Sequence, residues 1–196
     1  TTAGTPWRMI VFVTGWTRIW LESGTCLTQT TMCMPMLRLH HRLKDGFNAR
    51  CSVEHLTPAD LWIQAASAGE AYLADEILKH LNPPQPIKIL LTTNTLQGLE
   101  IIHKGIAGIS TGQPKIKASA SYFPFDRPAI MDAAVKKINP RIMILLETEI
   151  WPGLLLALKK SNTRIFIING RLTIKSLSRF MKWRKFFQSI SPDKIL

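Results

Sequence analysis

Short apolar runs alternate with amphipathic runs from Asp60 to the end of the chain. The apolar runs predict buried strands, at residues 61–66, 87–93, 119–123, 141–146 and 164–169. The amphipathic runs predict helices, at residues 70–81, 96–104, 128–138, 151–160 and 174–187. Residues 105–117 are rich in Gly, Ser, Thr and Lys and predict a loop, while residues 191–196 predict a turn and the start of a sixth strand.

This alternation predicts the fold class. Helices between successive strands are typical of a parallel sheet that is covered on both faces, and continuously apolar strands fit such burial. We therefore expect an α/β fold, a Rossmann-like parallel sheet with flanking helices, over residues 37–196. Because the last strand has only begun where the chain ends, we expect the chain to be a fragment of a longer protein.

Residues 1–36 lack the pattern and are expected to form a separate N-terminal arm. The apolar stretch Met9–Val13 is much shorter than the about 20 residues that a membrane-spanning helix needs. Trp7, Trp16 and Trp20, with arginines nearby, are residue types that favour a lipid headgroup boundary. The arm is therefore a candidate membrane-proximal segment.

The charge balance narrows the class of partner. The 196 residues include 25 Lys and Arg against 13 Asp and Glu, a formal net charge of +12, which favours a negatively charged partner. The segment from Lys159 to Lys185 has nine basic residues and no acidic residue; Trp183 lies within it, and Phe186 and Phe187 follow it directly. That mixture suits an anionic membrane surface, although a solvated helix face is the simpler alternative. No helix-turn-helix, RNA-recognition or zinc-finger pattern accompanies the charge, so we expect no nucleic-acid partner.

The three cysteines are expected to be free thiols, because their number is odd and a chain of this size needs no disulfide staples. The histidines near them would be the other ligands of a zinc ion, but no C-x2-C pair or similar short spacing is present. We expect no metal site and no cofactor.

Candidate chemistry lies where the predicted strands end, because open α/β sheets bind ligands at the carboxyl ends of their strands. Glu70 and Glu149 each stand near a predicted helix start, where a carboxylate can simply stabilise the helix dipole. Glu147 directly follows six strand residues, most of them apolar, so its side chain is expected to be partly desolvated, which favours a functional role. Glycine-rich dinucleotide and P-loop signatures are absent, and the order of Asp and His after Ser67 does not fit an esterase.

Five motifs at these strand ends resemble the 3-deoxy-D-manno-octulosonic acid (Kdo) transferases of lipopolysaccharide synthesis. Those enzymes carry S-V-G-E, T-T-x-T-x-x-G-x-E, Y-x-P-[YF]-D-x-P, E-T-E-L-W-P and N-[AG]-R-[LM]-S in this order. The matching segments are Ser67–Glu70, Thr92–Glu100, Tyr122–Pro128, Glu147–Pro152 and Asn169–Thr173. Ala68 replaces the Val of the first motif and Thr173 the Ser of the last, and neither change removes a reactive group.

The resemblance implies that the chain is the N-terminal, acceptor-binding half of a two-domain GT-B glycosyltransferase. Such an enzyme transfers Kdo from CMP-Kdo to a lipid A precursor, with inversion and without a metal. It implies that Glu70 is the general base and Glu147 the transition-state stabiliser. The substrate-binding residues that it implies are Ser67, Gly69, Glu149, Arg171 and Ser176.

The same resemblance implies that CMP-Kdo binds to a C-terminal domain absent from this chain, so we expect the chain alone to be inactive. It places the protein at the cytoplasmic face of the bacterial inner membrane, attached peripherally or through its N-terminus. The alternative hypothesis is a non-catalytic basic domain that binds anionic lipid at the membrane surface. The sequence does not determine the number of Kdo units, the preferred acceptor or the oligomeric state.

Overall fold

A computed structural model describes residues 9–13, 17–21, 45–109, 112–147, 150–170, 188 and 191–196. The strands are β1 (Met9–Val13), β2 (Thr17–Leu21), β3 (Leu61–Ala65), β4 (Ile87–Thr93), β5 (Ile116–Tyr122), β6 (Ile142–Leu146), β7 (Arg164–Ile168) and β8 (Lys194–Ile195). The helices are α2 (Phe47–Cys51), α3 (Ala68–His80), α4 (Leu96–Ile109), α5 (Pro128–Ile138) and α6 (Pro152–Lys160). None of the helices in these ranges is long and apolar enough to cross a membrane.

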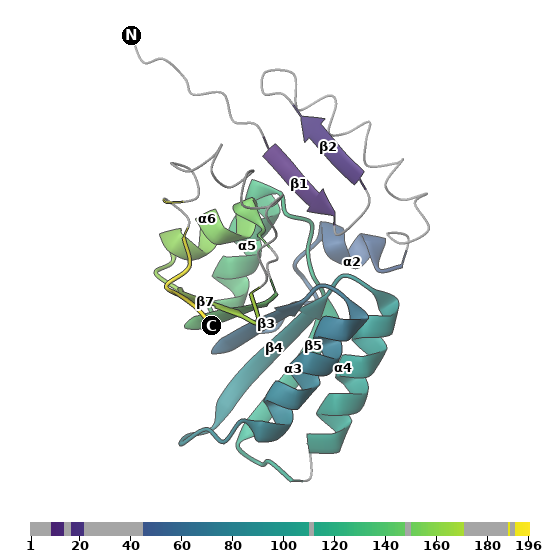
Figure 1. Cartoon of the computed structure of the whole chain (residues 1–196), viewed down its shortest axis with the longest axis vertical. Coiled ribbons are helices and arrows are strands. Elements are labelled where there is room, and N and C mark those ends of the chain that lie inside the picture. Colours follow the sequence, from purple (N-terminus) through teal and green to yellow (C-terminus); the bar gives the residue numbers. More distant parts are fainter. Residues whose placement is uncertain are drawn as a thin grey trace.

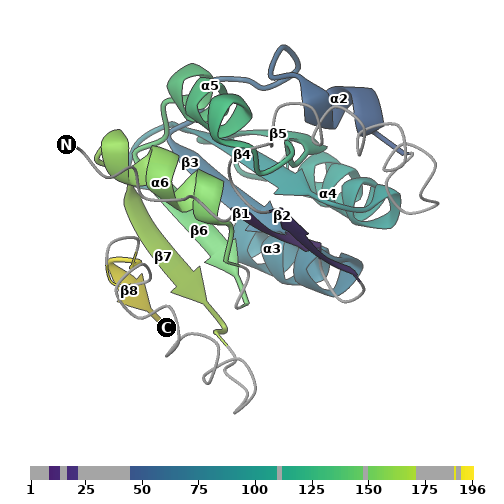
Figure 2. The ribbon, with the colours of Figure 1, turned by 90° about the horizontal axis from the view of Figure 1, so that it is seen from above.

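Six parallel strands form the central sheet, in the order β5-β4-β3-β6-β7-β8 (Figures 1 and 2). The chain builds β3, β4 and β5 outward in one direction, then returns to place β6 on the other side of β3. This is the strand order of a Rossmann fold, with its switch point between β3 and β6. The expectation of an α/β, Rossmann-like parallel sheet with flanking helices is confirmed.

The sheet is buried on both faces because successive side chains of each strand point to opposite sides. On one face, Ile63 and Leu91 pack against apolar residues of α3 and α4. On the other face, Trp62 and Leu145 pack against apolar residues of α5 and α6. The helices therefore cover the two faces in pairs, and the loops at the carboxyl ends of the strands run between the two layers.

Most of the predicted elements are confirmed, and two boundaries are corrected. The α4 helix runs to Ile109, five residues beyond its expected end, and β5 begins at Ile116, three residues before its expected start. Two glycines in residues 105–109 suggested a loop, yet Ile102, Ile106 and Ile109 keep a helical spacing and pack on the core. The sixth strand is confirmed as β8, which pairs with β7. The helix expected at residues 174–187 lies outside the described residues.

Three elements in the N-terminal part were not predicted. Strands β1 and β2 form an antiparallel pair within the expected N-terminal arm, with Met9 opposite Leu21 and Val13 opposite Thr17. Helix α2 is a single short turn that begins after Gly46, whose φ is 70°. A Cβ at Gly46 would lie 2.3 Å from Cδ2 of Tyr122, and the φ is left-handed, so glycine suits this approach of α2 to the end of β5.

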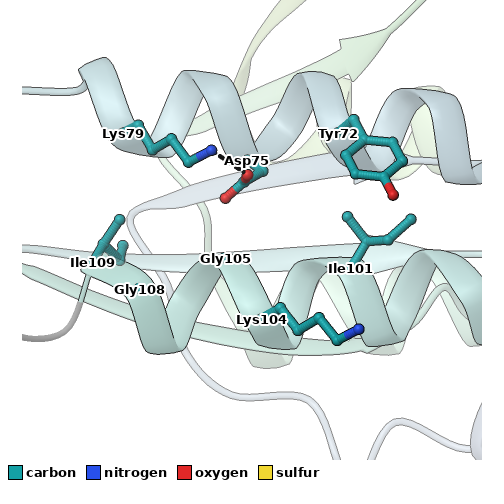
Figure 3. Close-up of a pocket in the computed structure, with 8 residues that line it drawn as sticks. All are labelled: Tyr72, Asp75, Lys79, Ile101, Lys104, Gly105, Gly108 and Ile109. Carbon is teal, nitrogen blue, oxygen red and sulfur yellow. Dashed lines mark ion pairs between the residues drawn. The ribbon is translucent and has the colours of Figure 1, made fainter.

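Helices α3 and α4 lie side by side and leave a hollow of about 310 Å³ between them (Figure 3). Tyr72 and the ion pair of Lys79 with Asp75, whose N–O distance is 2.7 Å, line it from α3. Gly105 and Gly108 line it from α4, and no strand end contributes to it. The close approach of the helices depends on Gly105, because a Cβ there would lie 2.2 Å from Oδ1 of Asp75.

Ala substitutions at these two glycines should change stability in opposite directions. Gly108→Ala meets nothing within 4 Å and should stabilise the fold by up to about 1 kcal/mol, because Ala has the higher helix propensity. Gly105→Ala gains the same propensity but displaces Asp75 from Lys79, and overpacking costs about 1–3 kcal/mol. Urea unfolding should therefore rank Gly108→Ala above the wild type and Gly105→Ala below the wild type. Equal stabilities of the two variants would contradict the helix contact.

Candidate active site

The carboxyl ends of β3 and β6 meet at the switch point of the sheet, where α/β folds bind their ligands. The two strands pair directly, from Leu61 opposite Ile142 to Gln64 opposite Leu145. Glu70 lies in the first turn of α3, which follows β3, and Glu147 directly follows β6. The fold therefore brings together the two carboxylates that were expected to act in catalysis, and the charge of Glu147 contributes to raising the pKa of Glu70.

Glu70 is held by hydrogen bonds at the start of α3. The hydroxyl of Ser67 donates to Oε1 over 2.8 Å, and the backbone N–H of Ala66 donates to Oε2 over 2.7 Å. In return, the N–H of Glu70 donates to Oγ of Ser67, which is the N-cap residue. This reciprocal arrangement closely matches a capping box and fixes the carboxylate in one orientation. Gly69 is exposed beside it, between Ser67 and Glu70.

Burial is the main influence on the pKa of Glu70, a residue that is only 5% exposed. Burial raises the pKa of Glu70 above its usual value, because water no longer stabilises the charged form. The hydrogen bonds from Ser67 and Ala66 lower the pKa, and Glu147 raises it. A capping box explains the fixed geometry of Glu70, but it does not require a burial that disfavours the charge. A raised pKa brings a carboxyl group closer to the range in which it serves as a general base.

Glu147 has a left-handed backbone, with φ at 58°. Its N–H donates to the carbonyl of Ile168 over 2.9 Å, which ties the end of β6 to the end of β7. Asn169 adopts the same φ at the corresponding place after β7. Asn tolerates this conformation, whereas most other residues with a Cβ pay about 1–2 kcal/mol for it. Glu147 is half-buried and its backbone is strained, and strained residues of this kind cluster at functional sites.

Asp126 belongs to the motif matched at Tyr122–Pro128, but the sequence analysis gave this residue no role of its own. It follows β5, is 3% exposed, and accepts hydrogen bonds from the N–H of Gly153 over 3.0 Å and of Leu154 over 2.7 Å. Burial raises its pKa to about 6, although the two N–H groups favour the charged form. The signal in the sequence was indirect: α6 begins at Trp151-Pro152, which offers no capping side chain of its own.

Arg50 is a second residue that sequence reasoning missed. It is 4% exposed, donates a hydrogen bond to the carbonyl of Asn94 after β4, and lies against the rings of Tyr122 and Phe125 at 5.3 and 5.8 Å. Burial lowers its pKa to about 10. Arg50 thereby joins α2 to the ends of β4 and β5. A lone Arg in an irregular segment carries no pattern from which this burial could be predicted.

The remaining predicted residues fall into two groups. Ser67 and Gly69 are at the first turn of α3, beside Glu70. Glu149, Arg171 and Ser176 lie outside the described residues, as do Cys26 and Cys33. A hollow of about 690 Å³ is present at the opposite edge of the sheet, lined by strand starts and helix ends such as Asp60, Arg141 and Arg164. It contains none of the predicted site residues, and ligands of α/β sheets bind at the other edge.

Asp126 should give folding stability a distinctive pH dependence. Its pKa is about 6 in the fold against an ordinary value of 3.8, so the folded state holds the proton more tightly than the unfolded chain. Stability from this group is complete below pH 3.8 and is lost as the pH rises through 6, by roughly 3 kcal/mol. The unfolding free energy of the wild type, measured in urea, should therefore fall relative to that of Asp126→Asn between pH 4 and pH 7. Parallel pH curves would contradict the raised pKa.

Comparisons with known proteins agree on one family. A family model described as 3-deoxy-D-manno-octulosonic-acid transferase (kdotransferase) matches residues 38–194. A bifunctional glycosyltransferase/methyltransferase of Fusobacterium nucleatum is 27% identical over 163 residues, which are 82% of this chain and 24% of that protein. A 3-deoxy-D-manno-octulosonic acid transferase of Haemophilus influenzae is 27% identical over 160 residues, which are 78% of this chain and 34% of that protein. A 3-deoxy-D-manno-octulosonic acid transferase of Rickettsia bellii is 30% identical over 132 residues, which are 66% of this chain and 29% of that protein. The chain thus spans about a quarter to a third of the length of these relatives.

Proposed function

Because the chain belongs to the 3-deoxy-D-manno-octulosonic-acid transferase family, we propose that it is the acceptor-binding half of a GT-B glycosyltransferase. The protein that contains it transfers Kdo from CMP-Kdo to a lipid A precursor, in the synthesis of lipopolysaccharide. The observation that carries the proposal is the pair of carboxylates, Glu70 and Glu147, at the switch point of a Rossmann-like sheet. The relatives named as Kdo transferases support the chemistry.

Glu70 is the general base of the proposed reaction. A hydroxyl of the acceptor gives its proton to the Glu70 carboxylate while its oxygen forms a bond to the anomeric carbon of Kdo. The bond from that carbon to the phosphate oxygen breaks at the same time, and CMP leaves with the electron pair, so the configuration is inverted. The raised pKa of Glu70 and its hydrogen bonds from Ser67 and Ala66 support this role, since an oriented carboxylate with a pKa nearer neutrality is an effective base.

Glu147 stabilises the transition state. Positive charge develops on the sugar as CMP departs, and a fixed carboxylate in a poorly hydrated place favours that charge. The half-buried position of Glu147 and the hydrogen bond that holds its backbone support this assignment. The base is a side chain of the chain itself and the leaving group is a phosphate ester, so the proposed steps need no metal and no cofactor.

The other substrate contacts follow from the motifs that this chain shares with the family. Ser67 and Gly69 face the acceptor beside Glu70, and Glu149, Arg171 and Ser176 complete the substrate-binding set. CMP-Kdo binds to a C-terminal domain, in keeping with relatives that are more than twice as long as this chain. Residues 37–196 form the acceptor-binding domain and residues 1–36 a membrane-proximal arm. The net charge of +12 favours attachment to the anionic cytoplasmic face of the bacterial inner membrane.

A transfer assay with the complete protein tests the proposal. The protein is incubated with CMP-Kdo and a lipid A precursor, and the lipid is examined by mass spectrometry. We expect a product heavier by one or more Kdo units, and no product from residues 1–196 alone. An unmodified acceptor from a complete protein that binds CMP-Kdo would contradict the transferase assignment. Transfer by residues 1–196 alone would contradict the assignment of the donor site to another domain.

The net charge also favours a second candidate function, a non-catalytic domain that binds anionic lipid. It predicts binding to phosphatidylglycerol vesicles that weakens with salt, together with no effect of Glu70→Gln on the function of the complete protein. Loss of transfer in Glu70→Gln with unchanged vesicle binding supports the enzyme and excludes the purely binding role.

A further inference from the structure

We propose that Asp126 is a positioning residue of this site: it fixes the start of α6 and, through it, the backbone that carries Glu147. This inference rests on the proposed function, because it assigns Asp126 a part in placing the transition-state stabiliser. Asp126 lies on the loop after β5, whereas Glu147 follows β6 and α6 follows Glu147 along the chain. Contacts of the described residues join Asp126 to the start of α6, and the continuity of the chain joins the start of α6 to Glu147.

The start of α6 has no local cap. Trp151 is at the N-cap position and makes no side-chain capping hydrogen bond, and Pro152 at the first helical position has no N–H to donate. The next two N–H groups, of Gly153 and Leu154, both donate to the carboxylate of Asp126, 27 and 28 residues earlier in the chain. The N–H of Leu155 is the first to bond within the turn, to the carbonyl of Trp151. Asp126 therefore accepts hydrogen bonds from two N–H groups at the start of α6 that have no acceptor within the helix, and it does so from another segment of the chain.

The contact between Asp126 and α6 leaves little space for adjustment. A Cβ at Gly153 would lie 2.7 Å from Oδ1 of Asp126 and 3.2 Å from its Cγ, so the carboxylate rests directly on the glycine. Three residues before Asp126, the ring of Phe123 packs on the ring of Trp151, with centroids 5.0 Å apart. The segment after β5 thus holds the segment that begins α6 at two points.

Glu147 is close in the sequence to the start of α6 that Asp126 and Phe123 contact. Only three residues separate it from Trp151 in the sequence. Its own N–H donates to the carbonyl of Ile168. Its φ of 58° lies in the left-handed region, which is small for a residue with a Cβ and leaves little room for adjustment. A displacement of the helix start would therefore be passed to the backbone of Glu147, or would break its bond to β7.

The way in which α6 is capped also indicates a role beyond stability. A Ser, Thr, Asp or Asn at position 151 would cap the helix from its own N-cap position. Instead the protein buries a carboxylate almost completely and gives it two backbone N–H groups as hydrogen-bond donors, so burial raises its pKa to about 6. A costly remote cap is expected where it fixes two segments relative to each other, and both segments here end at the catalytic edge of the sheet.

The first test measures the electrostatic contact between the two glutamates, which needs no enzymatic activity. The pKa of Glu70 is set by burial, by the hydrogen bonds from Ser67 and Ala66, and by the charge of Glu147. NMR titration of the Glu70 side-chain carbon in the chain should show a lower pKa in Glu147→Gln than in the wild type. In an Asp126→Ala background, Glu147→Gln should change the pKa of Glu70 less, because Glu147 is no longer held in place. An equal change in both backgrounds would overturn the proposal.

Two further variants keep this test decisive. Asp126→Asn retains the volume and one acceptor oxygen, so it is used if Asp126→Ala does not fold, with the same direction expected. Asp132→Ala, on α5, removes an exposed carboxylate paired with Lys160 at 3.1 Å and is the matched control. It should leave the effect of Glu147→Gln at its wild-type size. Loss of the effect in this control as well would show that any Asp variant near the α5 and α6 helices disturbs the site, which also overturns the proposal.

Kinetics of the complete protein separate positioning from mere stability. Asp126→Ala should lower kcat by roughly ten- to a hundred-fold, the scale of a small misplacement, with the KM for CMP-Kdo within about twofold of the wild type. Asp126→Asn should recover part of the kcat. A folded Asp126→Ala enzyme with wild-type kcat would overturn the positioning role. If Glu147→Gln itself leaves kcat unchanged, the proposed function of Glu147 fails, while the pKa measurement still decides whether Asp126 holds it.

Discussion

Glu70→Gln should lower kcat for sugar transfer by about 10²–10⁴-fold in the complete protein, the range that a general base contributes. Gln cannot take the proton of the acceptor hydroxyl, but it retains one carbonyl oxygen for the hydrogen bonds that Ser67 and Ala66 donate to Glu70. The unfolding free energy should therefore stay within about 1 kcal/mol of the wild type, since one hydrogen bond is at stake. Transfer is followed by mass spectrometry of the lipid and stability by urea unfolding.

Glu76→Gln is the matched control for this substitution. Glu76 lies on the same helix, is exposed and pairs with Lys79 over 2.9 Å, away from the strand ends. The control should keep full activity, because exposed ion pairs contribute little to stability. Wild-type transfer by Glu70→Gln would remove the base from the proposed mechanism, and an equal loss in Glu76→Gln would show that the effect is not specific to the site.

Glu147→Gly should make the fold more stable and the enzyme much less active. Glycine adopts a φ of 58° without the steric cost that Glu pays, which favours the variant by about 1–2 kcal/mol before its greater entropy in the unfolded chain removes up to about 1 kcal/mol. The substitution also removes a negative charge next to Glu70. At the same time, the variant lacks the carboxylate proposed to stabilise the transition state, and kcat should fall by about 10²–10³-fold.

Glu147→Ala separates strain from charge. It loses the carboxylate but keeps a Cβ at the left-handed position, so it should be as inactive as Glu147→Gly and less stable than it by about 1 kcal/mol. Asn169→Gly, at the same φ after β7, should gain less stability than Glu147→Gly, because Asn tolerates the left-handed conformation. Equal stabilities of Glu147→Gly and Glu147→Ala would show that Glu147 carries no backbone strain.

The sequence predicted the elements well wherever local pattern and burial agree. The runs at 87–93 and 128–138 became β4 and α5 with the expected bounds, since an apolar run and an early Pro suffice to define them. The C-terminal half of α4 was misjudged because Gly105 and Gly108 are poor helix formers, and packing of its isoleucines on the core outweighs their propensity. Tertiary contacts of this kind have no local signature.

The site was predicted less completely than the fold. Glu70 and Glu147 stand at strand ends, which the sequence shows, but their roles came from resemblance to a family rather than from spacing. Their proximity depends on the return of the chain from β5 to β6, and no local pattern fixes that strand order. Asp126 lies in a matched motif, but it caps a helix 27 residues away, and Arg50 is buried between segments that are distant in the sequence, so only the folded structure shows what these two residues contact.

The most direct test of the paired carboxylates is the pH dependence of kcat/KM for transfer by the complete protein. In the wild type, the rate should rise with pH as Glu70 ionises, with an apparent pKa above the ordinary glutamate value. In Glu147→Gln, the residual activity should rise at a lower pH, because the carboxylate that raises the pKa of Glu70 is gone. An acid limb that stays at the same pH in Glu147→Gln would contradict a catalytic site shared by Glu70 and Glu147.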